Sequence, residues 1–366
     1  MQFPTYDVIV IGLGSMGLST VHYLSRAGFN VLGLEQFSIY NDKASHSGDT
    51  RLIRKSYFEH SDYVPMLSLA YNNWYELERL TSKKLFYKTG ISYMGDANGP
   101  ILSGVQRSAA QYDITIDERW MPVFNKAVAK DALFEPEAGY LDVYQTFEVL
   151  KGLCEKQGAI LKEYQKVTQW KREGDLIAVS VGEEVYKSKQ LVITAGSWMQ
   201  KLVPMKLSLK VSRQVVAWFE TSDRTLDIPC WSLDHPEGKG IYYGFSRTER
   251  GFKIGHHFQG VVTDPDNVNR KVEEVETQEL KAVLEKMLPG NSFQLMNTAT
   301  CLSTNSSDEH FIIDYLPDSD HSVVLAGGFS GHGYKFVTAV GSLVTDLVKK
   351  QDTSVSIDFL SLKRFQ

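Results

Sequence analysis

The chain has 366 residues, of which 43% are hydrophobic and 23% charged, and this length predicts two domains around a large core. The net charge of -5 and the lack of a basic block argue against a nucleic-acid partner. No apolar stretch reaches the roughly 18–20 residues of a membrane-spanning helix, and Cys154, Cys230 and Cys301 stand too far apart for a disulfide framework or a metal site. These features predict a cytoplasmic protein with no membrane, nucleic-acid or metal partner.

The start of the chain predicts a strand, a helix and a second strand. Residues 6–11 form a continuous run rich in β-branched side chains, as in a parallel strand that is covered on both faces. An amphipathic segment follows and ends at Gly28, a common helix stop, and residues 31–35 form a second buried strand. A strand–helix–strand succession of about thirty residues has the size of one βαβ unit.

Three glycines stand at the turn between the first strand and the helix. Gly12, Gly14 and Gly17 make a GxGxxG pattern, which serves a tight turn, a close approach to phosphate and a close helix–strand contact. Glu35 ends the second strand, where a carboxylate accepts hydrogen bonds from the ribose hydroxyls of a dinucleotide. The same glycines also suit a purely structural turn, and the pattern does not separate FAD from NAD. The dinucleotide interpretation assigns cofactor contacts to Gly12, Gly14, Ser15, Met16, Gly17 and Glu35.

The remainder of the chain alternates between helical and strand-like patterns. The spacing of apolar residues predicts helices over residues 63–80, 146–160, 278–287 and 334–349. The other segments divide into buried strands at 190–196 and 322–326, a stretch rich in strand formers at 206–260, and short strand-like pieces and turns at 85–145.

This order predicts a mixed α/β chain (α+β overall) of two domains. One is a Rossmann-like βαβ domain that binds the nucleotide, and the other is an antiparallel-sheet substrate domain inserted into it in two pieces. The predicted boundaries are residues 1–82, 146–205 and 318–366 for the nucleotide domain, and residues 83–145 and 206–317 for the substrate domain.

A polar segment follows the βαβ unit. Residues 45–54 have the sequence SHSGDTRLIR, with small polar side chains, a histidine and two arginines in ten positions. Such a segment is often a solvated loop, but it also suits a loop over the cofactor, because arginine forks onto carboxylates and phosphates. Arg51 and Arg54 are three residues apart and would share a face on a helical turn.

This segment resembles the SHHGDTRLIRHAY segment of the family of monomeric sarcosine oxidase and N-methyltryptophan oxidase. The resemblance extends over nearly the whole chain, in order and at similar spacing, and includes the C-terminal residues 364–366. It implies FAD rather than NAD, and a fold of the glutathione-reductase/D-amino-acid-oxidase type with an FAD-binding domain. The other matching stretches are residues 63–65, 88–90, 134–136, 240–245, 252–255, 308–314 and 328–336.

The resemblance gives Cys301 a role that the sequence alone does not give it. A single cysteine in such a setting is more often a small buried hydrophobe. The matching cysteine of the family is bonded through sulfur to the 8α-methyl carbon of FAD, which requires a thiolate in a protected, electropositive setting. The resemblance therefore implies covalent 8α-S-cysteinyl FAD at Cys301, with further cofactor contacts from His46, Thr50, Arg51, Gly328, Gly331, His332, Gly333 and Lys335.

The family match also assigns residues to the substrates. Arg54 and Lys335 correspond to the pair that anchors the substrate carboxylate, and two cations suit one carboxylate in a water-poor site. Lys253 corresponds to the family's oxygen-activating lysine, whose positive charge stabilises superoxide beside the flavin; by pattern alone it would be a lysine on an exposed strand face. The predicted catalytic set, of which the last two match residues that line the family's substrate cavity, is Lys253, Arg51, His257 and Tyr243.

The implied reaction is the two-electron oxidation of an N-methyl or α C–H bond of a secondary amino acid. The imine hydrolyses to an aldehyde and a primary amino acid, and oxygen takes up the electrons to give hydrogen peroxide. The expected partners are a small secondary amino acid and O2, and the resemblance suggests a monomer. Two alternatives stay open: oxidation of an amino acid of the glycine, D-amino-acid or fructosyl-amino-acid type, and a flavin-bearing subunit with little turnover of its own.

Two positions depart from the family. Ser47 stands where the family has the second histidine of a pair, and Ser303 stands where it commonly has tyrosine. Both side chains are expected to face the flavin or the cavity. Smaller side chains there predict a wider pocket and a substrate bulkier than sarcosine.

Overall fold

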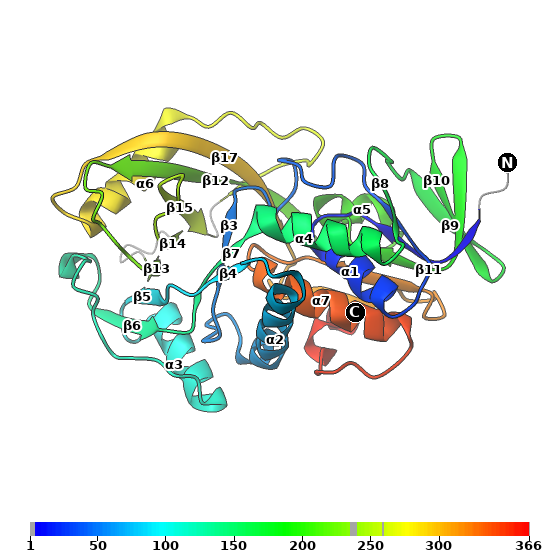
Figure 1. Ribbon diagram of the computed structural model, residues 1–366, viewed down its shortest axis with the longest axis horizontal. Coiled ribbons are helices and arrows are strands. Elements are labelled where there is room, and N and C mark those ends of the chain that lie inside the picture. Colours follow the sequence, from blue (N-terminus) through cyan, green and yellow to red (C-terminus); the bar gives the residue numbers. More distant parts are fainter. Residues whose placement is uncertain (1–3, 235–239, 258–259, 366) are drawn as a thin grey trace.

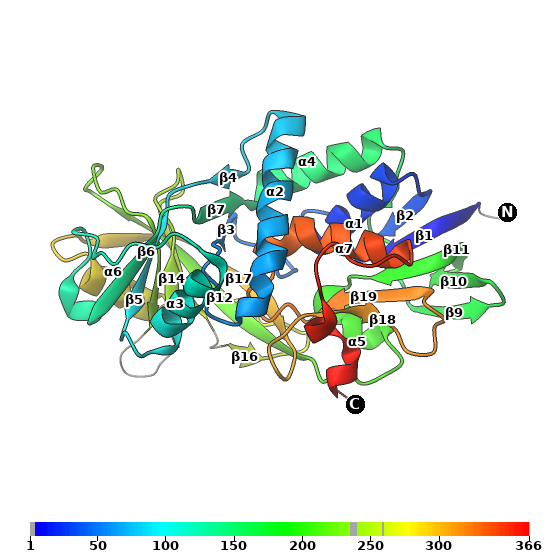
Figure 2. The same cartoon turned by 90° about the horizontal axis from the view of Figure 1, so that it is seen from below.

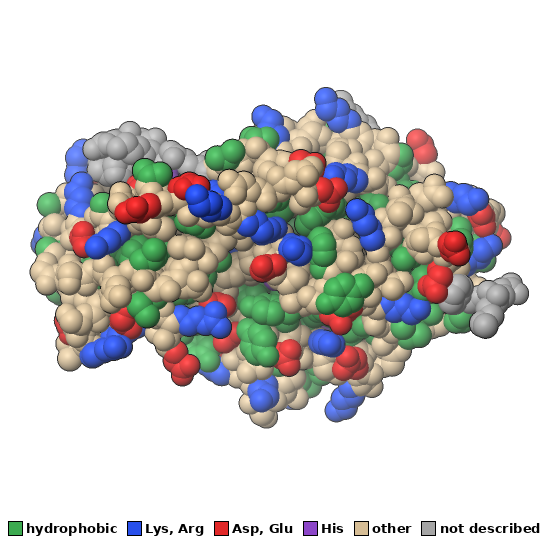
Figure 3. Space-filling view, turned by 90° about the horizontal axis from the view of Figure 1, so that it is seen from above, with side chains coloured by type: hydrophobic (Ala, Val, Ile, Leu, Met, Phe, Trp, Pro, Cys, Tyr) green, Lys and Arg blue, Asp and Glu red, His purple; other side chains and the backbone are tan. Residues whose placement is uncertain are grey.

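The computed structural model describes residues 4–234, 240–257 and 260–365. Within these ranges the strands form two eight-stranded sheets and one three-stranded sheet. Figure 1 shows the two large sheets at opposite ends of an elongated molecule. None of the helices described is long and apolar enough to cross a bilayer. Acidic and basic side chains are interspersed over the face that Figure 3 shows.

The first sheet has a parallel centre. Its order is β18–β19–β11–β1–β2–β8, with β10 also paired to β11 and β9 paired to β10. Its strands are β1 (Thr5–Ile11), β2 (Val31–Leu34), β8 (Ile160–Lys162), β9 (Gln169–Glu173), β10 (Leu176–Val181), β11 (Glu184–Ile193), β18 (Ile312–Tyr315) and β19 (Val323–Gly327). β1 lies in parallel between β2 and β11. Val8 and Val10 belong to one core cluster, and Ile9 and Ile11 belong to another. Both faces of β1 are therefore covered, which explains its continuous apolar sequence.

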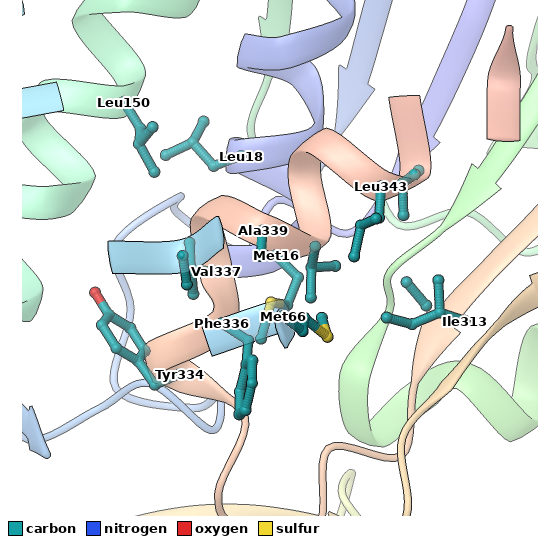
Figure 4. Close-up of a cluster of buried hydrophobic side chains, with 14 of the residues drawn as sticks. Met16, Leu18, Met66, Leu150, Ile313, Tyr334, Phe336, Val337, Ala339 and Leu343 are labelled. Atoms are coloured by element: carbon teal, nitrogen blue, oxygen red, sulfur yellow. The ribbon is translucent and has the colours of Figure 1, made fainter. Parts of the chain in front are cut away.

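Four helices pack together beside this sheet: α1 (Ser15–Arg26), α2 (Val64–Thr81), α4 (Val143–Lys156) and α7 (Val337–Val348). Figure 2 shows α7 between α1 and α2, and Figure 4 shows side chains of all four helices converging, among them Leu18, Met66 and Leu150. Gly341 allows α1 and α7 to approach closely, because a Cβ there would stand 2.8 Å from the backbone of Ser19. This packing explains why α7 is apolar around most of its circumference.

The second sheet is mainly antiparallel and comes from two separate parts of the chain. Its order is β16–β12–β15–β14–β13–β5–β6, with β17 beside β12, and its strands are β5 (Ile91–Gly95), β6 (Asp131–Glu135), β12 (Lys210–Thr221), β13 (Cys230–Asp234), β14 (Ile241–Gly244), β15 (Phe252–His257), β16 (Val261–Val262) and β17 (Phe293–Asn305). The two parts join where β5 pairs in parallel with β13. Helix α6 (Glu274–Met287) packs against β15 and β17, and α3 (Pro100–Tyr112) packs against β5.

A small third sheet lies between the two large ones, as Figure 1 shows. It contains β3 (Thr50–Ile53), β4 (Phe86–Tyr87) and β7 (Gly139–Asp142) in the order β3–β7–β4. The polar segment predicted to cover the cofactor leads into β3. The remaining elements are α5 (Met199–Leu202) and the 3-10 turns Ser61–Tyr63, Lys126–Val128, Gly196–Trp198, Tyr334–Phe336, Asp358–Leu360 and Leu362–Phe365.

The structure confirms the predicted α/β class, with a βαβ start and a largely antiparallel second sheet. The prediction of only strand-like pieces and turns over residues 85–145 is wrong, because α3 occupies residues 100–112. Helix α3 buries Ile101, Leu102 and Val105 against the second sheet. The domain division stays a prediction, and its boundary at 318 cuts β18 off from the first sheet to which this strand belongs. Sheet membership favours a boundary before Ile312.

Candidate active site

A cavity of about 330 Å³ lies between the two large sheets and takes its walls from both. Gly12 and Glu35 come from the first sheet region, and Tyr243 and Cys301 come from the second. Lys335, just before α7, lines the same space. The predicted dinucleotide motif and the predicted substrate residues therefore meet in one cavity, in the size range of ligand pockets.

The three glycines of the GxGxxG pattern have different steric surroundings. Gly12 has a φ of 90°, and a Cβ there would stand 2.8 Å from the Cα of Ala195. A Cβ at Gly17 would stand 1.8 Å from the carbonyl oxygen of Gly12, so only glycine lets α1 approach this turn. A Cβ at Gly14 would meet only His46 Nδ1, at 3.8 Å, so this side of the turn is open to the cavity. Gly14 caps α1 without a side-chain hydrogen bond, which leaves the first N–H groups of the helix for a phosphate.

Glu35 is buried at the end of β2. Its Oε2 accepts a hydrogen bond from the backbone N–H of Leu13 at 2.8 Å, and its Oε1 accepts from Phe37 N–H at 3.0 Å. Burial raises the pKa of Glu35, and these backbone hydrogen bonds oppose that rise. Each carboxylate oxygen can accept a further hydrogen bond, and Glu35 lines the cavity, as a partner for the ribose of a dinucleotide must.

Two buried polar atoms on the cavity wall test whether a flavin dinucleotide fits. His46 Nε2 and Gln214 Oε1 have no hydrogen-bond partner within the described part of the protein. Burial lowers the pKa of His46 to about 3, with Arg51 contributing, so the imidazole is neutral. Buried polar groups are normally satisfied. A polar ligand along this wall would satisfy both atoms, and the residues present fit FAD.

Cys301 is the one cysteine of the three that lines this cavity. It lies on β17, opposite Gln214 of β12. Cys154 lies in the helical core beside Leu18, and Cys230 is the first residue of β13 and lies in the core against the second sheet. Burial raises the pKa of both core thiols. The position of Cys301 is the only one of the three from which sulfur could reach a molecule in the cavity.

Residues 45–49 form a loop (the Arg51 loop), which Arg51 at the start of β3 holds in shape. The Arg51 guanidinium donates to the carbonyl oxygens of Thr50 and Ser45, both at 2.8 Å, and to that of Ser47 at 2.5 Å. Ser47 Oγ donates to Thr300 O at 3.1 Å, which ties the loop to β17 next to Cys301. Ser47 and Ser303 are both expected to face the flavin or the cavity. Ser303 lines the cavity, whereas Ser47 does not, because its hydroxyl turns to the strand.

Lys253 lies behind this loop and not on the cavity wall. Its Nζ donates to the carbonyl oxygen of Thr50 at 2.6 Å and to Thr50 Oγ1 at 2.9 Å, and it also donates to the carbonyl oxygen of Gly48. Nζ lies 4.2 Å from the ring centroid of Phe245. Burial, and then Arg51, lowers the pKa of Lys253 well below its usual value. A buried amine with these neighbours takes up a proton readily when negative charge arrives nearby.

Arg54 and Lys335 form the buried basic end of the cavity. Arg54 Nη2 donates to both carboxylate oxygens of Glu59, at 2.6 and 2.7 Å, and Lys335 Nζ donates to His332 O at 2.7 Å. Burial opposes the charge of Glu59, but the paired Arg54, with Lys335 contributing, lowers its pKa to about 2. Burial, and then Arg54, lowers the pKa of Lys335 to about 7. Both cations face a space in which a small carboxylate would find two donors.

His332, His257 and Tyr243 complete the polar wall. His332 Nε2 donates to the carbonyl oxygen of Glu309 at 3.1 Å, so Nδ1 accepts from the hydroxyl of Tyr57. Burial lowers the pKa of His332 to about 3 and that of His257 to about 4, so both imidazoles are neutral. Tyr243 lies beside His257, with ring centroids 6.5 Å apart.

The comparisons with known proteins agree with this geometry. The model of the family described as FAD dependent oxidoreductase matches residues 7–347. The chain belongs to this family. Monomeric sarcosine oxidase of Bacillus sp. (strain B-0618) is 33% identical to it, over 98% of this chain and 96% of that protein. N-methyl-L-tryptophan oxidase of Citrobacter koseri is 32% identical, over 98% and 99%.

A solved structure shows the same fold. It is NikD, "an unusual amino acid oxidase essential for nikkomycin biosynthesis", which has a TM-score of 0.85 and 22% identity, over 98% of both chains. The predicted family, the fold class and the dependence on FAD are thus confirmed.

As a member of this FAD-dependent family, the chain brings most of the predicted site residues to one cavity. Gly17, Thr50 and Lys253 do not line it, because Gly17 packs on Gly12 and the other two lie behind the Arg51 loop. Sequence reasoning missed Glu59 and Gln214, which line it as well. The predicted residues on the wall are Gly12, Gly14, Ser15, Met16, Glu35, His46, Arg51, Arg54, Tyr243, His257, Cys301, Gly328, Gly331, His332, Gly333 and Lys335.

Proposed function

We propose that this protein is an FAD-dependent oxidase of secondary amino acids, of the sarcosine-oxidase or N-methyltryptophan-oxidase type. The products are an aldehyde, a primary amino acid and hydrogen peroxide. The observation that carries the proposal is the pair of buried cations, Arg54 and Lys335, in the cavity that also holds the dinucleotide motif and Cys301. Sarcosine oxidases and an N-methyl-L-tryptophan oxidase at 32–34% identity support the same reaction class.

The residues that line the cavity would hold FAD in one direction. The start of α1 would hold the pyrophosphate, Glu35 the ribose, and the wall around Gly331 and Cys301 the flavin. When bound, FAD supplies the two-electron acceptor for oxidation of a C–H bond next to nitrogen. Cys301, which lines the same cavity, would bond through its sulfur to the 8α-methyl carbon of the flavin. Gly331 has a φ of 76°, and a Cβ there would stand 2.8 Å from His257, so the loop before α7 lies close against β15.

The two cations would bind the substrate carboxylate and act on the substrate amine. Arg54 has five N–H donors, so its pairing with Glu59 leaves donors for a second carboxylate. A positive charge near an ammonium group lowers its pKa. Arg54 and Lys335 would therefore favour the neutral amine, whose lone pair the oxidation requires. Burial of both side chains keeps water from weakening these interactions.

Lys253 is proposed to assist the reaction with oxygen, from behind the Arg51 loop. Its Nζ is held by Thr50 and by the carbonyl oxygen of Gly48, so the ammonium group that it forms when negative charge arrives would have a fixed position. We further propose that the enzyme acts as a monomer in the cytoplasm. Relatives are named monomeric, and the three cysteines are not paired with one another, which suits a reducing compartment.

The test has two parts that separate the cofactor link from the reaction. The purified protein is precipitated with trichloroacetic acid, and flavin is expected in the pellet for the native protein but not for Cys301→Ser. Sarcosine and N-methyltryptophan are then added under nitrogen, and at least one is expected to bleach the flavin absorbance, with one equivalent of peroxide formed when air is admitted. Flavin in the supernatant of the native protein would refute the covalent link. An unbleached flavin with both compounds would refute the oxidase.

A further inference from the structure

One buried aromatic ring lies beside both cations of the proposed carboxylate site. The centroid of the Tyr57 ring is 4.6 Å from the guanidinium carbon of Arg54 and 5.2 Å from Lys335 Nζ. The Phe58 ring lies over Arg54, at 4.1 Å. The Phe336 ring lies 5.7 Å from Lys335 Nζ. Of the rings in the described part of the chain, that of Tyr57 is therefore the one that the two cations share.

Tyr57 is itself fixed on two sides. Its side chain is 0% exposed, and its ring packs edge-on against Phe336, with the centroids 5.5 Å apart. Ser108 of α3 donates a hydrogen bond to the carbonyl oxygen of Tyr57 at 2.5 Å. The position of the ring is thus set by α3 on one side and by the segment before α7 on the other.

The hydroxyl of Tyr57 reaches the backbone that holds Lys335. Burial raises the pKa of Tyr57 well above its usual value, so the hydroxyl keeps its proton. It donates to His332 Nδ1, because His332 Nε2 donates to the carbonyl oxygen of Glu309. The carbonyl oxygen of His332 accepts from Lys335 Nζ at 2.7 Å. Tyr57 therefore acts on Lys335 twice, through its ring and through the histidine that presents the acceptor.

A ring in this position opposes the effect of burial on the two charges. The ammonium group of Lys335 has three N–H donors, and His332 O is its one acceptor among the described residues. The negative face of an aromatic ring attracts a cation, most strongly where water is excluded. Lys335 is 5% exposed, so the Tyr57 ring supplies part of the stabilisation that water would otherwise give. The same ring favours the charge of Arg54, which repels that of Lys335.

Tyr57 does not line the cavity, so it would act on a substrate only through the two cations. We propose that Tyr57 is a positioning residue, whose ring and hydroxyl fix Arg54 and Lys335 in place for one carboxylate. This inference rests on the proposed function and deepens it at the carboxylate site.

The experiment follows acetate binding to the flavin-bound protein, by its effect on the flavin spectrum, between about pH 5.5 and 9. Lys335 loses its proton near pH 7, and the charge on it is set by burial, by Arg54 and by Glu59. His332 and His257, which also face it, are neutral over this range. The native protein is expected to lose affinity for acetate as the pH rises through about 7. The midpoint of this loss reports how well the site stabilises the ammonium group.

Two variants of Tyr57 separate the ring from the hydroxyl. Tyr57→Leu removes both, and the midpoint is expected to fall by about one pH unit, as the loss of one buried cation–π contact would give. Tyr57→Phe keeps the ring, so the midpoint is expected to stay at the native value. The hydrogen bond that it loses to His332 is expected to weaken binding less than tenfold at every pH.

Tyr63→Leu is the matched control for the loss of packing. Its ring is also 0% exposed and lies 5.2 Å from the Tyr57 ring, but within the described part of the chain no cation lies over it. The variant is expected to keep the native midpoint. If Tyr57→Leu does not retain flavin, phenylalanine at position 57 is given ring fluorines instead, which weaken the negative face of the ring and keep its shape. The midpoint is then expected to fall as fluorines are added.

The outcomes separate this inference from the proposed function. A midpoint that stays near pH 7 in Tyr57→Leu, or with the fluorinated rings, would overturn the inference and leave the oxidase intact. An equal fall in Tyr63→Leu would overturn it as well, because any loss of packing would then have the same effect. A native protein that does not bind acetate at any pH would refute the carboxylate site, and with it the proposed function.

Discussion

Lys335 is a residue whose charge depends on the cavity around it. Burial, and then Arg54, lowers its pKa to about 7, and its Nζ faces the space proposed for the substrate carboxylate. The ammonium form is present below pH 7 and is lost as the pH rises above 7. Acetate, which has no amine of its own to titrate, is therefore expected to bind more weakly by about tenfold per pH unit above 7. Perturbation of the flavin spectrum measures its Kd between pH 6 and 9.

The control for this titration is Lys335→Met. With no amine to titrate, the variant is expected to bind acetate weakly at pH 6 and to show little further change up to pH 9. A Kd of the native protein that stays constant over the same range would mean that Lys335 does not hold the carboxylate. The same result would leave Arg54 as the single anchor.

Lys253 can have a structural role or a role in the reaction with oxygen, and kinetics can separate the two. Its Nζ donates hydrogen bonds to the carbonyl oxygens of Gly48 and Thr50, so its role could be to hold the Arg51 loop in place. If instead its charge assists oxygen, Lys253→Met is expected to slow reoxidation of the enzyme by air about 100-fold, the usual effect of removing one electrostatic group. Reduction by substrate under nitrogen, followed by stopped flow, is expected to change less than tenfold. Equal losses in both half-reactions would support the purely structural reading.

At the scale of elements, replacing each of two helical glycines by alanine is expected to change the stability of the protein in opposite directions. Gly17 in α1 faces the carbonyl oxygen of Gly12, where a Cβ would stand at 1.8 Å, whereas Gly152 in α4 has no atom within 4 Å of a Cβ position. Gly17→Ala is expected to destabilise the protein by roughly 2 kcal/mol or more, because α1 must shift from the turn, and to lower its flavin content. Gly152→Ala is expected to stabilise it by about 0.5–1 kcal/mol. Urea unfolding and the ratio of flavin to protein absorbance measure both.

The elements that depend on local sequence patterns could be predicted, whereas contacts between distant segments could not. The signals for the βαβ unit at the start of the chain are local. The hydrophobic periodicity, the glycines of the turn and the acidic residue at the end of the second strand all lie within the first thirty-five residues, and they agree with β1, α1 and β2. Helix α3 was missed although Ile101, Leu102 and Val105 have helical spacing, because strand-like pieces surround them. The parallel pairing of β5 with β13 joins segments about 140 residues apart, and no local pattern encodes it.

The candidate site divides in the same way. Residues carried by a family motif, such as Cys301 and Lys335, could be named in advance, and the structure places them on one cavity. The Arg54–Glu59 pair could not, because two charges five residues apart have no preferred geometry outside a helix. Ser47 was misjudged for a similar reason: a small hydroxyl finds a backbone acceptor, here Thr300 O, that only the tertiary fold provides.

At the scale of the molecule, the cofactor would join the two large sheets, because the cavity takes walls from both. His46 Nε2 beside the first sheet and Gln214 Oε1 in the second lack partners within the described residues. Removing FAD leaves those atoms unsatisfied and the space between the sheets without its apolar contacts. The flavin-free protein is therefore expected to melt at least about 5 °C below the flavin-bound protein.

Cys301→Ser provides the sample for this comparison, because noncovalent FAD can be dialysed away and added back. Calorimetry of the variant with and without FAD measures the effect of the ligand, and the native protein adds the effect of the covalent link. Restoration of the higher melting temperature on adding FAD is expected, since the folded state alone binds the cofactor. Equal melting temperatures with and without FAD would contradict the view that the cofactor couples the two sheets, and would mean that β3, β4 and β7 between them suffice to hold the molecule together.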